Sequence, residues 1–174
     1  MAALRDMRWW KCPGARRIWG MHSSTSTHRD SRAPGTAAAH GHSRGPAGVA
    51  PGAGYRQVVS ARGRLVAVAG QIALDEYGGL VGAGDASAQA RQVFRNIGRC
   101  LAAEGARPAD LVKLTYFVTD IGDLPAVRKA RDAFLGGTEP PASTAVQVAA
   151  LFRPDLLLEV EALAVVPEDE AARA

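Results

Sequence analysis

Two acidic residues near the end of the chain could do chemistry. Glu159 and Glu161 are two positions apart in the apolar stretch 156–166, which has the composition of a β-strand. Because side chains alternate between the faces of a strand, both carboxylates point to one face. Their neighbours on that face are the apolar residues Leu157, Leu163 and Val165. Either a partner chain covers this face and the acids form ion pairs at a subunit contact, or they lie where the sheet meets a cleft.

The sequence excludes several other kinds of active site. Two acids on one strand cannot flank a sugar from both sides, which disfavours a glycosidase. Residues 55–174 contain no His, so nucleophilic triads and His-bound metals are excluded there. Cys12 and Cys100 form neither a disulfide framework nor a zinc motif, and we expect no metal and no organic cofactor. No apolar run reaches the length of a membrane span.

A second candidate feature is the step from Gly70 to Gln71, at the end of a predicted strand. A free backbone amide at this point could hold a carboxylate or an oxyanion. The alternative is a glycine that only allows a bulge or a turn.

Charge divides the chain into two unlike parts. Residues 1–54 hold eight of the 21 Lys and Arg residues but two of the 17 Asp and Glu residues. Residues 55–174 are therefore slightly acidic, which argues against a nucleic-acid groove formed by this part. We predict that 1–54 is a disordered, low-complexity extension, 55–167 a single domain, and 168–174 a polar tail. The extension could be an upstream-extended start, an organelle-targeting segment or a nucleic-acid contact through its tryptophans and arginines.

The elements that would position these residues follow from hydrophobic periodicity. Residues 55–60 and 64–70 predict a hairpin around Gly63. An apolar stripe after Asp85 predicts one helix, and 124–135 predict a second. Stretches 111–118, 143–151 and 156–166 alternate as strands. The resulting order, β-β-α-β-α-β-β, is typical of an α+β fold with both helices on one face of a sheet.

Five segments and an opening Tyr55 carry a family resemblance. They are AGQIALD at 69–75, QARQVFRNIGRCLAAEGA at 89–106, LVKLTYFVTDIGD at 111–123, VRKARDAFL at 127–135 and PASTAVQVAALFRPDLLLEVEALAV at 141–165. In order and spacing they resemble the RidA/YjgF family of enamine/imine deaminases. The resemblance implies a chorismate-mutase-like α+β fold and a homotrimer with small-molecule clefts between its subunits. It also implies hydrolysis of a 2-imino acid to a 2-keto acid and ammonia, without a metal or cofactor.

The resemblance assigns roles to matching positions and exposes three departures. Tyr55 would wall the cleft, the Gly70 amide would help fix the ligand, and Glu159 would hold the water. The family's carboxylate-binding Arg is replaced by Ser143, a small Cys by Ala145, and an Asn of the second helix by Arg128. Because a hydroxyl cannot replace a bidentate cation, the expected anchor is missing.

Two hypotheses follow from these departures. In the first, Arg128 moves the positive charge into the cleft, where a small acidic metabolite binds; otherwise it is a solvated helix residue. In the second, the protein is a non-catalytic ligand-binding or regulatory paralogue, and a ribonuclease is a further alternative. We expect a cytoplasmic protein without membrane partners, or an organellar one if the extension is a targeting segment.

Overall fold

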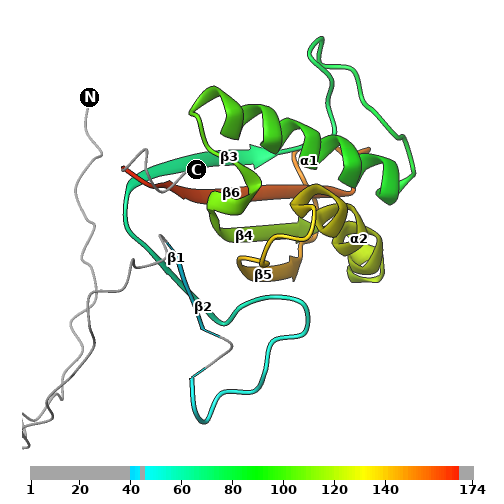
Figure 1. The fold of residues 1–174 in the computed structure, drawn as a ribbon. Helices are drawn as coiled ribbons and strands as arrows, with labels where there is room; N and C mark the ends of the chain where they lie inside the picture. The colour runs from blue at the N-terminus through cyan, green and yellow to red at the C-terminus, as the bar shows by residue number, and fades with distance from the viewer. Residues whose placement is uncertain (1–39, 44–45, 169–174) are drawn as a thin grey trace, which may run out of the picture. The chain divides into compact units, whose positions relative to one another are not determined.

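The computed structural model describes residues 40–43 and 46–168 (Figure 1). The strands are β1 (His40–Ser43), β2 (Val58–Ala61), β3 (Arg64–Gln71), β4 (Leu111–Val118), β5 (Ala142–Gln147) and β6 (Leu158–Val166). The helices are α1 (Ala86–Ala103) and α2 (Leu124–Leu135), and short 3-10 turns, Pro108–Asp110 and Ile121–Asp123, precede β4 and α2. Most of the extension and the end of the tail lie outside the described residues.

The main sheet has four strands in the order β3-β6-β4-β5. β6 is antiparallel to both β3 and β4, whereas β4 and β5 are parallel and are joined by α2. Both helices cover one face of this sheet, as Figure 1 shows. From β2 onward, the element order predicted from sequence is confirmed, and so is the mixed α+β class.

The ends of both helices are set by the residues that the sequence indicated. The Asp85 carboxylate caps α1 by accepting hydrogen bonds from the amides of Ser87 (2.8 Å) and Ala88 (3.0 Å). Gly136 ends α2 in the left-handed conformation, with φ of 59°. The apolar side of α1 then packs on the sheet through fully buried side chains, including Phe94 and Ile97.

The predicted pairing of β2 with β3 is wrong. β2 pairs instead with β1, a strand in a region where the sequence predicted no regular structure. The physical reason is burial: β3 places Val66 and Val68 in the core by pairing with β6, whereas Val58 of β2 stays 47% exposed. Gly63, with φ of 145°, lets the chain pass close to the Val166 carbonyl at the end of β6.

The second face of the sheet carries no helix. Leu65 is 62% exposed, Val146 39% and Leu163 38%, and all three side chains belong to this uncovered face. A shallow hollow of about 420 Å³ on it is lined by residues of β3, β4 and β6, among them Lys113 and Glu161. Among the described residues, no helix is long and apolar enough to cross a membrane.

Candidate functional site

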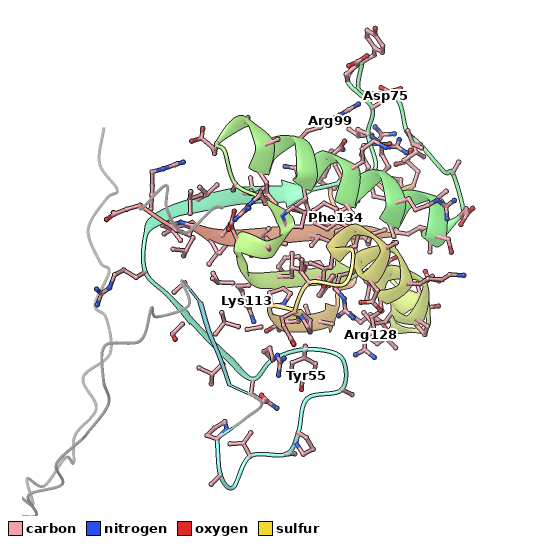
Figure 2. The ribbon with its side chains drawn as sticks, in the orientation of Figure 1. Tyr55, Asp75, Arg99, Lys113, Arg128 and Phe134 are labelled. Carbon is pink, nitrogen blue, oxygen red and sulfur yellow. The ribbon has the colours of Figure 1, made fainter. Side chains whose placement is uncertain are left out.

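A cavity of about 240 Å³ opens on the helix side of the sheet, at its β5 edge. Its eight lining residues are Tyr55, Tyr116, Ile121, Leu124, Arg128, Arg131, Ser143 and Ala145. Four of the six site residues predicted from sequence are therefore brought together here. In Figure 2, Tyr55 and Arg128 come from two distant segments and lie on the same side of the domain.

Strand register places the β5 and β4 members of this cavity. Ser143 lies opposite Leu114, and Ala145 lies opposite Tyr116, in the parallel pairing of β5 with β4. Because Leu114 and Tyr116 are buried beneath the helices, Ser143 and Ala145 project to the same face. The small side chains at 143 and 145 leave the space that the cavity occupies.

Tyr55 forms one wall of the cavity, and the segment that contains it pairs with the open edge of β5. Arg56 forms an isolated parallel bridge with Ala142, and its amide donates to the Pro141 carbonyl at 3.3 Å. The Arg56 side chain also forms an ion pair with Glu139. These contacts hold the segment before β2 against the edge strand, so that the half-buried Tyr55 faces the cavity.

α2 contributes two guanidinium groups, of which the sequence indicated only one as a site residue. Arg128 is exposed at the cavity rim, whereas Arg131, three positions later, is 4% exposed. The Arg131 Nε and Nη2 atoms donate to Asp132 Oδ1 at 2.9 and 2.6 Å. The sequence could have indicated Arg131, because this residue lies on the apolar side of the helix one turn after Arg128.

The hydroxyl of Tyr116 is a second feature that the sequence did not single out. This side chain is 2% exposed, its ring lies 6.5 Å from that of Phe94, and its hydroxyl has no hydrogen-bond partner in the described part of the chain. Burial raises the pKa of Tyr116 above its ordinary value, and the nearby Arg131 and Ser143 oppose that rise. Tyr116 is therefore a neutral hydrogen-bond donor near pH 7.

Gly70 and Glu159 lie together, but on the other face of the sheet from this cavity. β3 bulges between Val68 and Gln71, and Gly70 is part of that bulge. A Cβ atom at Gly70 would overlap the carboxylate of Glu159, so the glycine leaves room for the acid in its present position. Glu159 faces away from the helices because its neighbours Leu158 and Val160 are buried beneath them.

Amide side chains of α1 fix the segments that carry these two residues. Gln89 is fully buried, donates to the Asp155 carbonyl and accepts from the Leu157 amide, both at 2.9 Å. Asn96 donates to the carbonyls of Ile72 (3.1 Å) and Leu74 (2.9 Å). The helix thus holds the start of β6 and the chain that leaves the bulge.

Gln89→Leu is expected to lower the free energy of unfolding by about 2–3 kcal/mol, because the Asp155 carbonyl and the Leu157 amide both lose their partner. Urea unfolding at fixed protein concentration measures this loss. Arg91→Leu, at an exposed position of the same helix, is the control and should change stability by less than about 0.5 kcal/mol. Equal stability of the two variants would contradict a structural role for Gln89.

A metal site is not found in the described residues, since no three His, Cys, Asp or Glu side chains come together there. The chemistry available at the cavity is that of two cations, two phenols, a serine hydroxyl and apolar walls. Such a site can bind and orient a small anion.

Comparison with known proteins relates the whole domain to one group. A family model described as "Endoribonuclease L-PSP" matches residues 47–166, so the match begins eight residues before the predicted boundary at Tyr55. A 2-iminobutanoate/2-iminopropanoate deaminase of Salmonella typhimurium is 39% identical over 122 residues, covering 69% of this chain and 91% of that protein. A RutC family protein of Synechocystis is 37% identical over 123 residues, covering 70% of this chain and 91% of that protein.

Solved structures show the same relationship. A Rid family protein of Yersinia pestis superposes with a TM-score of 0.68 at 34% identity and covers 74% of this chain and 99% of its own. RidA of a Psychrobacter species gives a TM-score of 0.55 at 34% identity, covering 67% of this chain and 92% of its own.

Proposed function

This chain belongs to the Endoribonuclease L-PSP family, to which the RidA/YjgF proteins belong, and we propose that it hydrolyses reactive 2-imino acids. Water adds to the imine carbon, the carbon–nitrogen bond breaks, and the products are a 2-keto acid and ammonia. The observation that carries the proposal is the small cationic cavity, which gathers Tyr55, Arg128, Ser143 and Ala145. The name of the Salmonella typhimurium relative points to the same reaction.

In this proposal Arg128 takes over the role of the missing anchor. No ion pair of Arg128 is found among the described residues, so its guanidinium is available to a ligand carboxylate. Ser143 is half-buried, and its hydroxyl makes one long hydrogen bond, 3.4 Å, to the Pro141 carbonyl. Ser143 would therefore contribute one polar contact rather than a charge.

The water would be held by Glu159, with the Gly70 amide helping to fix the ligand. Within one chain these two residues lie across the sheet from the cavity, so a single copy holds the two halves of the site apart. A second copy that brings its Glu159 to the cavity of the first would complete the site. We propose a homotrimer, the assembly that the family resemblance implies, in which three copies arranged in a ring give three equivalent sites. The exposed Leu65, Val146 and Leu163 on the uncovered face are suited to such a contact.

Arg128→Ala is expected to lower kcat/KM for ammonia release from enzymatically generated 2-iminopropanoate by at least about tenfold, because a charged contact to the carboxylate is lost. The full chain is assayed with Lys129→Ala as the matched control. Lys129 is the next residue, is also exposed, and does not line the cavity. Equal activity of the two variants would contradict a binding role for Arg128.

A non-catalytic ligand-binding protein is the alternative, favoured by the replacement of the family's Arg by Ser143. It predicts retained binding of small acids without ammonia release. RNA cleavage, which the description of the matching model names, would have to occur on a slightly acidic domain. Cleavage by the full chain that Arg128→Ala leaves unchanged would favour that activity over the deaminase.

A further inference from the structure

We infer that the ligand of this cavity carries two acid groups, one bound by Arg131 with Tyr116 inside the cavity and one bound by Arg128 at the rim. The inference rests on the proposed use of the cavity as the ligand site, and it defines the substrate class as small dicarboxylic 2-imino acids. Neither Arg131 nor Tyr116 is part of the anchor implied by the family resemblance.

At the inner position the ligand would meet Arg131, a buried cation whose charge is only partly neutralised by the protein. Asp132 contacts the Arg131 guanidinium along its Nε and Nη2 side, and the Asp132 side chain is itself 64% exposed. Water screens an exposed carboxylate, so this pair offsets the buried positive charge only in part. The guanidinium lies on the cavity wall, where an acid group of the ligand can complete its coordination.

Tyr116 gives independent evidence for an anion at this position. Its buried hydroxyl has no partner within strict hydrogen-bond geometry in the described chain, although Arg131 and Ser143 lie close enough to act on its pKa. A buried donor without a well-placed acceptor lowers the stability of the folded state. The hydroxyl lies near both Arg131 and Ser143. A phenol donor beside a guanidinium and a serine hydroxyl is a suitable environment for a carboxylate, which only accepts hydrogen bonds.

The outer position is Arg128, one helical turn before Arg131. The cavity lining contains these two cations and no acidic residue, and Asp132, which lies outside the lining, offsets the charge of Arg131 only in part. Side chains three residues apart on a helix are neighbours, with Cβ atoms about 5–6 Å apart, so one small diacid can reach both guanidinium groups. The cavity volume of about 240 Å³ equals roughly eight water volumes, enough for a molecule of about that many heavy atoms.

The test compares succinate with succinamate, in which one acid is replaced by an amide of nearly the same shape. Isothermal titration calorimetry of the full chain at constant ionic strength should give at least about tenfold tighter binding of succinate. Arg128→Met should abolish this preference while binding of one acid group remains. Arg131→Met should weaken both ligands, and circular dichroism verifies its fold.

Tyr116→Phe separates ligand binding from folding. It should weaken succinate binding while the Tm of the free protein stays the same or rises, because the removed hydroxyl had no partner. A loss of binding with a lowered Tm would assign the hydroxyl a structural role and overturn its part in the site. Equal affinity for the two ligands, no binding of either at millimolar concentration, or unchanged binding by folded Arg131→Met would overturn the inference.

The outcomes also separate this inference from the proposed function. Ammonia release from 2-iminopropanoate without a preference for succinate would contradict the two-acid inference but would support the deaminase proposal. Tight succinate binding without ammonia release from any imino acid would support a ligand with two acid groups and would contradict the deaminase proposal.

Discussion

Glu159→Gln is expected to lower kcat for imine hydrolysis by at least about 100-fold, whereas substrate binding changes little. The amide keeps the size of the side chain but loses the charge that orients a water and the capacity to transfer its proton, and such groups contribute about 10²–10⁴-fold. The measurement is steady-state ammonia release from 2-iminopropanoate by the full chain. Because Glu159 would hold the water and not the ligand carboxylate, its loss should leave KM nearly unchanged.

Glu161→Gln is the matched control for this prediction. Glu161 is on the same strand and the same sheet face, two positions away, and it borders the hollow of the uncovered face. The bulge glycine, Gly70, approaches Glu159 and not Glu161. A comparable loss of kcat in both variants would indicate a general effect of charge on the uncovered face and would contradict a specific role for Glu159.

Mixed oligomers of Arg128→Ala and Glu159→Gln should recover activity that neither variant has alone. If each site takes Arg128 from one copy and Glu159 from the next, random assembly of equal amounts leaves about a quarter of the sites with both native residues. Co-expression with two different affinity tags allows the mixed species to be purified. Its ammonia release is compared with that of each pure variant and of the native protein.

Two outcomes would contradict the shared site. Activity of the mixed species that equals the mean of the two pure variants would mean that both residues act within one copy. A monomer by light scattering, with full activity, would show that the uncovered face of the sheet needs no partner.

Sequence patterns predicted the helices and the order of elements along the chain, because buried positions recur periodically within these elements. The apolar residues after Asp85 keep a helical repeat without interruption, and 111–118 keep a strand-like alternation. The helix and the strand that form there both begin within one residue of the predicted position. The partner of β2 could not be predicted in this way. The four residues of β2 are small or β-branched, and such residues can pair with the edge of several strands. The observed pairing depends on His40–Ser43, a segment without a strand-like sequence pattern.

The site was predictable where residues match a known pattern and not where tertiary structure creates the environment. Alternation in 111–118 groups Tyr116 with Leu114 and Val118 on one side of the strand, but no pattern in the sequence indicates the surroundings of its hydroxyl. Arg131 likewise falls on the apolar stripe of α2, where a cation conflicts with the period. That conflict was the one available sign of a functional position.

The bulge in β3 has a consequence for how this protein can change over time. Any side chain at position 70 would occupy the space of the acid at position 159, so the two positions constrain each other as a unit. A substitution at position 70 that keeps the acid requires the Glu159 carboxylate to move, whereas a chain without the acid has room for a side chain there. The glycine at position 70 is thereby linked to a carboxylate that lies about ninety residues further along the sequence.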